Sequence, residues 1–162
     1  NIQCEFPVKG IEIAVDDGET TTTVLLRGTL DKVEFEGGNK VNVVDYKTER
    51  PKSRNVMEGN TKDADGNYKR QLIFYKLLLD RYDDGKFVME SGEIDFIEPD
   101  KGGKYHKEKF IVTKEDVAAL EEEVKRAAGE ILSFRFWDKR CEKADCKYCK
   151  LRESIGDLRK LI

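Results

Sequence analysis

The first half of the chain alternates between apolar and polar positions in the manner of β-strands. Residues 2–15 alternate with an interruption near Lys9-Gly10, and Asp16-Asp-Gly-Glu19 has the composition of a turn. Residues 24–35 and 40–47 are rich in β-branched and aliphatic side chains, and Glu36-Gly-Gly-Asn39 separates them. These two segments therefore predict an antiparallel hairpin.

The second half mixes helical and strand patterns. Residues 67–81 contain few helix breakers and place apolar residues at helical spacing. Residues 87–89 and 93–97 favour strands, and Lys101-Gly-Gly103 is typical of a hairpin turn that leads into residues 105–112. Thr113 and Asp116 have the spacing of a capping box at the start of a second helix. The pattern predicts an α/β fold with a central mixed β-sheet, the 67–81 helix packed on it and the second helix covering another part.

The chain has the size of one domain. Its 162 residues are enough to bury a core, and we find no internal repeat and no domain boundary, only a long polar connection at residues 49–66. Hydrophobic residues make up 38% of the chain and occur in short runs, so we expect no membrane span, no signal sequence, no membrane partner and a cytoplasmic location. The net charge of −3 does not match a stand-alone DNA-binding protein.

Asp31 and Asp45 are predicted to face each other across the hairpin. If the turn is centred near Gly38, residues whose numbers sum to 76 lie opposite each other, and these two aspartates form such a pair. Like charges across a ladder are destabilising, so the pair favours a cation between them, and Lys47 projects from the same side of the pleat as Asp45. The alternative is a set of surface charges in a chain of which 39% is charged.

The two carboxylates and the lysine suit metal-assisted hydrolysis of phosphodiesters. One or two carboxylates bind Mg²⁺ while the ion keeps positions for water and phosphate oxygens. The ion activates water and stabilises charge on the phosphate, and a neighbouring ammonium orients the nucleophile or stabilises the transition state.

The motifs Gly28-Thr-Leu-Asp31, Asp45-Tyr-Lys-Thr48 and Gln71-Leu-Ile-Phe-Tyr75, in this order, resemble the PD-(D/E)xK nuclease superfamily over nearly the whole chain. The nearest likeness is the RecB-like nuclease domain at the C-terminal end of UvrD/Rep-type ATP-dependent DNA helicases. The resemblance implies a restriction-endonuclease-like core in which Asp31, Asp45 and the backbone carbonyl of Tyr46 bind Mg²⁺ or Mn²⁺ and Lys47 is catalytic. It also implies that Gln71 and Tyr75 are the glutamine and tyrosine that mark the RecB-like branch.

Helical spacing also links Gln71 and Tyr75, because residues four apart share one face of a helix. A glutamine amide and a tyrosine hydroxyl are suited to hold a phosphate or a base near the metal. The alternative is an ordinary buried tyrosine whose hydroxyl meets a polar neighbour.

A basic segment follows the Asp45-Tyr-Lys-Thr48 motif and continues into the next helix. Its charged residues are Arg50, Lys52, Arg54, Lys62, Lys69 and Arg70. They are placed to meet DNA phosphates beside the metal, and the alternative is a solvated charged loop.

Three of the four cysteines lie close together in the tail, at Cys141, Cys146 and Cys149. In a cytoplasmic protein such clusters bind metals more often than they form disulfides. By resemblance to RecB-like and AddB-like nucleases they are candidate ligands of an iron–sulfur cluster, with Cys4 as the distant ligand, although Ser154 and Ile155 stand where that family carries a further cysteine. A zinc site or a set of metal-free thiols are the alternatives.

The family also carries a helix before the sheet that completes its active site, and no such helix precedes Ile2 here. We expect residues 1–162 to be a single RecB-like nuclease domain, a C-terminal fragment without its first helix, with 141–149 as a cysteine-containing tail. His106 lies in a Gly/Lys-rich hairpin, where we expect it to be solvent-exposed. No G-x-x-x-x-G-K-[ST] phosphate loop is present, so any helicase motor lies elsewhere.

The sequence thus predicts a Mg²⁺-dependent deoxyribonuclease domain that acts in DNA repair or end processing. Its expected partners are DNA, upstream helicase domains of the same chain and a second helicase–nuclease subunit. We expect the longer protein to be active and the isolated fragment to cleave weakly or not at all. The alternatives are a catalytically inactive nuclease fold that binds DNA or a partner protein, and a thiol-bound metal module for protein interaction.

Overall fold

A five-stranded mixed sheet forms the centre of the computed structural model, which describes residues 1–16, 18–135, 139–143 and 145–156. The strands are β1 (Ile2–Asp16), β2 (Thr21–Gly37), β3 (Lys40–Lys47), β4 (Val88–Phe96) and β5 (His106–Phe110), and they lie in the sheet in this order. Neighbouring strands are antiparallel except β3 and β4, which are parallel. The predicted α/β fold with a central mixed sheet is confirmed.

The predicted hairpin is confirmed together with its register. Lys32 pairs with Val44 and Val33 with Val43, so opposite residues have numbers that sum to 76. Strand β1 is continuous from Ile2 to Asp16, and its register with β2 shifts between Val8 and Ile11, where Gly10 takes a positive φ of 72°. This β-bulge is the interruption expected near Lys9-Gly10.

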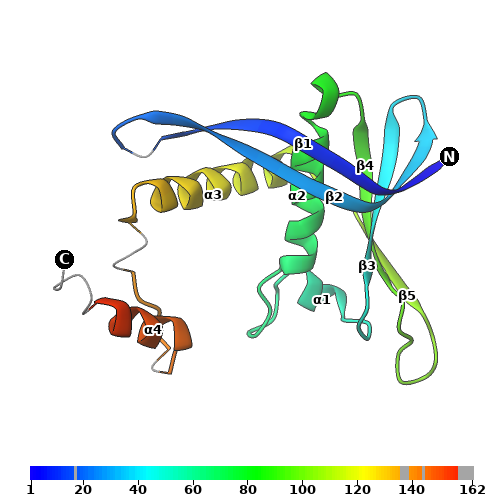
Figure 1. Cartoon of the computed structure of the whole chain (residues 1–162). Coiled ribbons are helices and arrows are strands. Elements are labelled where there is room, and N and C mark those ends of the chain that lie inside the picture. The colour runs from blue at the N-terminus through cyan, green and yellow to red at the C-terminus, as the bar shows by residue number, and fades with distance from the viewer. Residues whose placement is uncertain (17, 136–138, 144, 157–162) are drawn as a thin grey trace.

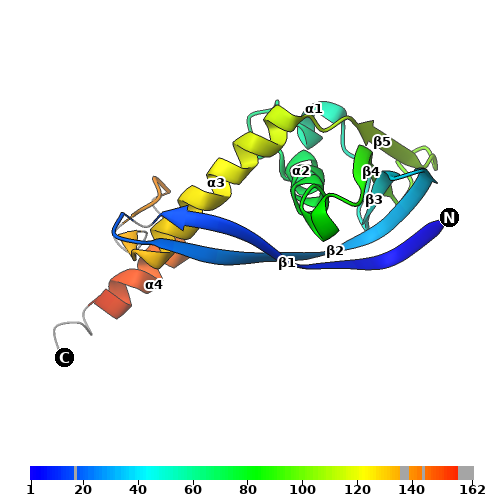
Figure 2. The same cartoon turned by 90° about the horizontal axis from the view of Figure 1, so that it is seen from above.

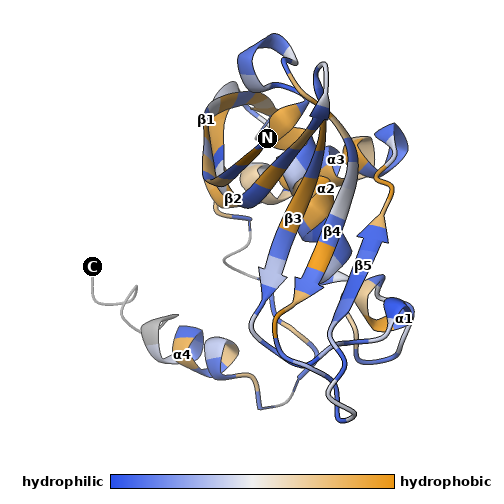
Figure 3. Cartoon of the chain, turned by 90° about the vertical axis from the view of Figure 1, so that its right-hand side faces the viewer, coloured by the Kyte–Doolittle hydropathy of each residue, from blue (hydrophilic) through white to orange (hydrophobic). Residues whose placement is uncertain are grey.

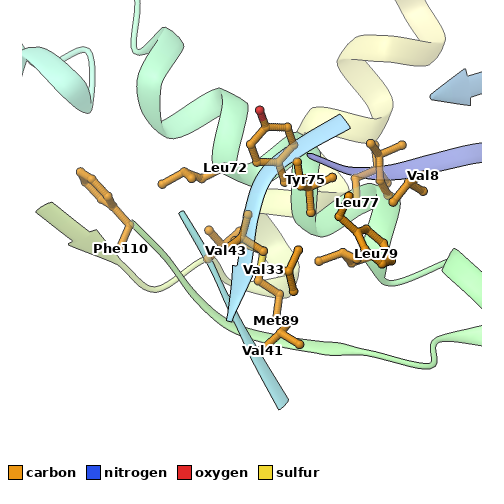
Figure 4. Close-up of a cluster of buried hydrophobic side chains, with 14 of the residues drawn as sticks. Val8, Val33, Val41, Val43, Leu72, Tyr75, Leu77, Leu79, Met89 and Phe110 are labelled. Atoms are coloured by element: carbon orange, nitrogen blue, oxygen red, sulfur yellow. The ribbon is translucent and has the colours of Figure 1, made fainter. Parts of the chain in front are cut away.

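Helix α2 (Asn67–Leu79) connects the two parallel strands and packs on the sheet. Figure 2 shows the sheet curving around this helix. The core that they enclose is almost entirely apolar and includes the residues labelled in Figure 4: Val8, Val33, Val41, Val43, Leu72, Tyr75, Leu77, Leu79, Met89 and Phe110. The Tyr75 hydroxyl points out of this cluster, which leaves it free to serve a polar site.

Helix α3 (Lys114–Leu132) lies along the long arm formed by β1 and β2, beyond the rest of the sheet (Figure 1). The predicted capping box is present: the Thr113 hydroxyl accepts from Asp116 N–H at 3.1 Å, and Asp116 Oδ2 accepts from Thr113 N–H at 3.0 Å. A Cβ at Gly129 would lie 2.7 Å from the backbone oxygen of Asp16, so the absence of a side chain allows this close approach.

The remaining elements are short. Helix α1 (Arg54–Met57) lies within the predicted polar connection, the 3₁₀ turn η1 spans Tyr82–Asp84, and α4 (Lys147–Gly156) begins within the cysteine tail and contains Cys149. Figure 3 shows hydrophobic stretches in β3 and β4 beside a hydrophilic β5 at the edge. Among the described residues, no helix combines the length and the apolar character needed to cross a bilayer.

Candidate active site

Asp31 and Asp45 come together where β2 and β3 part. Their ladder ends at the Lys32–Val44 pair, and beyond it the Tyr46 backbone N–H donates to Asp31 Oδ2 at 2.9 Å. Side chains two residues apart on a strand share one face, so both carboxylates lie on the same face as the core residues Val33 and Val43. The predicted convergence of the two aspartates is therefore present.

Asp45 is buried, with only 1% of its surface exposed. Burial raises the pKa of this carboxyl above its usual range, the nearby charge of Asp31 adds to the rise, and Lys47 and Tyr75 oppose it. Oδ1 accepts hydrogen bonds from Gln71 Nε2 at 2.6 Å and from the Tyr75 hydroxyl at 3.0 Å. Oδ2 accepts no hydrogen bond from any described residue, which leaves a buried anionic oxygen available for a ligand.

Lys47 is held beside this oxygen. Its Nζ forms an ion pair with Asp45 Oδ2 at 2.8 Å and donates to Gln71 Oε1 at 2.6 Å. The ammonium also lies 5.5 Å from the centre of the Tyr68 ring, within the range of a cation–π contact. The three contacts confine the lysine to one position next to the carboxylates.

Gln71 connects the other groups. Its amide nitrogen donates both to Asp45 Oδ1 and to the Tyr75 hydroxyl, at 2.6 and 2.8 Å, while its amide oxygen accepts from Lys47. Burial raises the pKa of Tyr75, so its hydroxyl stays protonated and donates to Asp45. The helix therefore brings Gln71 and Tyr75 to the carboxylate as predicted, and the polar neighbours of the buried Tyr75 hydroxyl are Asp45 and Gln71.

Sequence reasoning missed two residues, Tyr68 and Glu49. The Tyr68 hydroxyl donates to a carboxylate oxygen of Glu49, and its ring packs 6.2 Å from Phe96. Tyr68 lies three residues before Gln71 and seven before Tyr75, so all three occupy one face of α2. The helical spacing of Tyr68 with Gln71 and Tyr75 could have predicted its place at the site. The sequence around Glu49 contains no such pattern, because Glu49 contacts Tyr68, which belongs to another element.

Three of the six charged residues of the basic segment are neutralised by ion pairs. Lys52 pairs with Glu49 at 3.2 Å, Arg54 with Glu58 and Glu108 at 3.0 and 3.2 Å, and Lys69 with Asp116 at 3.2 Å. Within the described part of the chain, Arg50 and Lys62 form no ion pair, and Arg70 donates to the Asp65 carbonyl oxygen at 2.5 Å. The segment thus offers fewer free positive charges than the sequence predicts.

The cysteine tail forms a separate group. The sulfur atoms of Cys141, Cys146 and Cys149 lie within 4.8 Å of one another, and those of Cys141 and Cys149 are 3.6 Å apart. Hydrogen bonds from the Cys149 backbone and the Cys141 side chain lower the pKa of Cys146 to about 7. Cys4 is not a member of this group and lies on β1, so the structure does not support it as the distant ligand.

The residues of the carboxylate site fit a divalent ion. Two carboxylates converge, one oxygen of Asp45 is buried without a hydrogen-bond donor, and hard oxygen atoms are what Mg²⁺ and Mn²⁺ prefer. Lys47 provides positive charge next to the site. The arrangement has the donor set for metal-assisted phosphodiester hydrolysis.

Comparisons with known proteins agree with this geometry. Among solved structures, that of SSO0001 is similar in fold to this chain. It matches 82% of this chain with a TM-score of 0.50 and 16% sequence identity. The match covers 51% of the SSO0001 chain, so this chain spans about half the length of that protein, and the likeness concerns the fold. No curated protein matches. The family model of the PD-(D/E)XK nuclease superfamily matches residues 2–154, and the chain therefore belongs to that superfamily.

Proposed function

We propose that this chain is the metal-dependent deoxyribonuclease domain of a RecB-like or UvrD/Rep-like ATP-dependent DNA helicase in DNA repair or end processing. Membership of the superfamily supports nuclease chemistry. The single observation that carries a catalytic role is the cluster of Asp45, Lys47, Gln71 and Tyr75, in which Asp45 Oδ2 accepts no hydrogen bond and has the Lys47 ammonium beside it. A nuclease fold that had lost activity would not need to keep a buried carboxylate with one oxygen outside its hydrogen-bond network.

Asp31, Asp45 and the backbone carbonyl of Tyr46 would hold Mg²⁺ or Mn²⁺. The bound ion would supply Lewis-acid stabilisation of the phosphate and a more acidic water. Lys47 orients the attacking water and stabilises negative charge on the phosphate, because its ammonium is fixed beside Asp45. Gln71 and Tyr75 keep Asp45 and Lys47 in place and offer amide and hydroxyl groups to the DNA strand.

The helicase context rests on the motif resemblance alone. The partners we propose are DNA, helicase domains of the same chain and a second helicase–nuclease subunit, in the cytoplasm. We also propose that the thiols of Cys141, Cys146 and Cys149 bind a metal cofactor, with an iron–sulfur cluster as the first candidate, because their three sulfur atoms lie within 4.8 Å of one another.

The test of catalysis compares cleavage of linear DNA by the wild type and by Asp45→Ala and Lys47→Ala, with Mg²⁺ or Mn²⁺ supplied. We expect both substitutions to abolish cleavage. The control Lys86→Ala should leave it unchanged, because Lys86 follows α2 in the sequence and its ammonium contacts Asp83 and the Phe87 ring. Equal cleavage by all variants would exclude the assignment. Binding of DNA without cleavage by the longer protein would favour the inactive binding module.

The test of the cysteine tail is visible absorption and elemental analysis after anaerobic purification. We expect bound iron and sulfide in the wild type and loss of both in Cys146→Ser. A colourless protein free of metal would exclude a stably bound cluster.

A further inference from the structure

The β4–β5 hairpin lies at the same end of the sheet as the metal-binding residues. Lys47 and Phe96 are neighbours in the parallel register, and the Ile97 N–H donates to the Lys47 carbonyl oxygen at 3.1 Å. Residues 97–105 therefore start beside the lysine of the site and continue beyond it, as Figures 1 and 3 both show. At about 3.3 Å per residue the tip reaches at most about 15 Å past Lys47.

Asp100 braces this connection. Its Oδ1 accepts from the backbone N–H groups of Gly102 and Lys104 at 2.8 and 3.0 Å, and its Oδ2 lies 2.6 Å from His106 Nε2. Its own N–H donates to the Lys104 carbonyl at 2.8 Å. His106 is thus half-buried and paired, not a free surface residue as expected. A connection held by so many bonds presents its other side chains in fixed places.

Those other side chains are unused by the fold. Lys101 and Lys104 are exposed and form no ion pair within the described residues, unlike Lys52, Arg54 and Lys69 of the basic segment. Two free ammonium groups beside a phosphodiester-cleaving site have an obvious anionic counterpart in a nucleic-acid backbone.

Tyr105 adds an aromatic surface. It is 65% exposed and makes no hydrogen bond or ring contact in the part of the chain that the structure describes. Ile97, at the start of the same connection, is 51% exposed. An isolated exposed aromatic ring next to basic residues is the combination on which nucleic-acid bases stack.

We propose that the β4–β5 hairpin is a nucleic-acid contact element in which Lys101 and Lys104 bind backbone phosphates and Tyr105 stacks on an unpaired base of the strand that enters the site. The proposal rests on the proposed nuclease function and adds residues that the catalytic cluster does not contain. Because stacking needs an accessible base face, Tyr105 acts on unpaired nucleotides, whereas the two lysines act on any strand.

Binding rather than cleavage tests it. Fluorescence anisotropy with a labelled single-stranded oligonucleotide and with a blunt duplex, in Ca²⁺, measures affinity without turnover. We expect Tyr105→Ala to weaken single-strand binding about tenfold and duplex binding little, and Tyr105→Phe to restore it. The control is Tyr148→Ala, which removes an 84% exposed ring from α4.

The lysines are tested by salt dependence. We expect Lys101→Gln/Lys104→Gln to reduce the slope of log affinity against log salt by about 1.4 for single strands, as the loss of two phosphate contacts requires. Lys9→Gln/Lys114→Gln makes the same charge change elsewhere and should leave the slope unchanged.

The outcomes separate the two proposals. A wild type that binds DNA but whose hairpin variants match their controls would overturn the hairpin assignment and leave the nuclease function standing. Equal loss on the duplex and the single strand in Tyr105→Ala would overturn the stacking role. A wild type that binds neither DNA would overturn the proposed function itself, and the hairpin assignment with it.

Discussion

The Tyr75 hydroxyl donates to Asp45 Oδ1 at 3.0 Å, from a ring that is otherwise part of the apolar core. One residue of α2 therefore packs the fold with its ring and holds the Asp45 carboxylate with its hydroxyl. The position of the carboxylate is fixed by the same packing that stabilises the protein, so changes at the site have consequences for both stability and metal binding.

Asp45→Asn should remove activity without lowering the stability of the metal-free protein. Burial raises the pKa of Asp45, so the folded protein disfavours the charged form that is present at pH 7. We expect the free energy of unfolding in EDTA to be at least that of the wild type, and cleavage to fall roughly 100-fold or more. Urea denaturation and a cleavage assay measure the two effects.

The raised pKa of Asp45 also predicts how the stability difference between the wild type and Asp45→Asn changes with pH. A raised pKa means that the wild type gains stability as pH falls from neutral toward the ordinary aspartate value of about 3.9. The stability advantage of Asp45→Asn over the wild type should therefore shrink as pH falls.

Mg²⁺ at 100 times its Kd should add about 2.7 kcal/mol to the free energy of unfolding of the wild type and nothing to that of Asp45→Asn. A variant that gains as much from Mg²⁺ as the wild type would contradict the assignment of Asp45.

Tyr75→Phe should make metal binding more sensitive to acid. The Tyr75 hydroxyl favours the charged form of Asp45, so its removal raises the pKa of that carboxyl further, and a proton then competes with the metal at higher pH. We expect the pH below which Mg²⁺ no longer raises Tm to move upward. Tyr82→Phe, which removes the hydroxyl of a ring stacked on Phe87, is the control and should show no such movement.

Tyr68 should affect the chemical step through Lys47. Tyr68→Leu removes the ring that lies 5.5 Å from the ammonium, and cation–π contacts are worth about 0.5 to 2 kcal/mol, so we expect single-turnover cleavage to slow roughly 2- to 30-fold. Tyr68→Phe keeps the ring and loses only the bond to Glu49, so its loss should be smaller. Equal rates for Tyr68→Leu and the wild type would show that the ring does not position Lys47.

Gly129→Ala should destabilise the protein although alanine favours helices. A Cβ there would meet the backbone oxygen of Asp16 at 2.7 Å, and overpacking costs about 1 to 3 kcal/mol, against a helix-propensity gain of about 1 kcal/mol. We expect a net loss of up to about 2 kcal/mol in chemical denaturation. Ala118→Gly, on an exposed position of α3, calibrates the propensity term alone. A Gly129→Ala variant more stable than the wild type would mean that α3 does not pack closely against β1 at Asp16.

Local patterns predicted the parts of the site that local geometry determines. The register of Val33 with Val43 follows from the turn position, and the face shared by Gln71 and Tyr75 follows from helical spacing. Both are properties of neighbouring residues, which is why the predicted convergence of Asp31 with Asp45 is found in the structure.

Long-range pairing could not be predicted. The charge of Arg54 is met by Glu108, which is 54 residues away, and that of Lys69 by Asp116, so the basic segment looked more available than it is. The predicted strand segments 87–89 and 93–97 are one continuous β4, because Ser91 and Gly92 pair with β3 despite their weak strand propensity, and the register shifts across Glu90. The short α1 and α4 carry too little periodicity to stand out.

The parallel pairing of β3 with β4 affects the order in which parts of the fold form. Parallel neighbours need a crossover, so α2 must be laid across the sheet before β4 can join β3. The hairpin that carries Asp31 and Asp45 is local and is expected to form early, whereas Gln71 reaches Lys47 only with the crossover. A nascent chain that has left the ribosome only as far as Leu79 would have Asp31 and Asp45 in place without the bonds from Gln71 and Tyr75. Catalytic competence would then arise in the same cooperative step that forms the core.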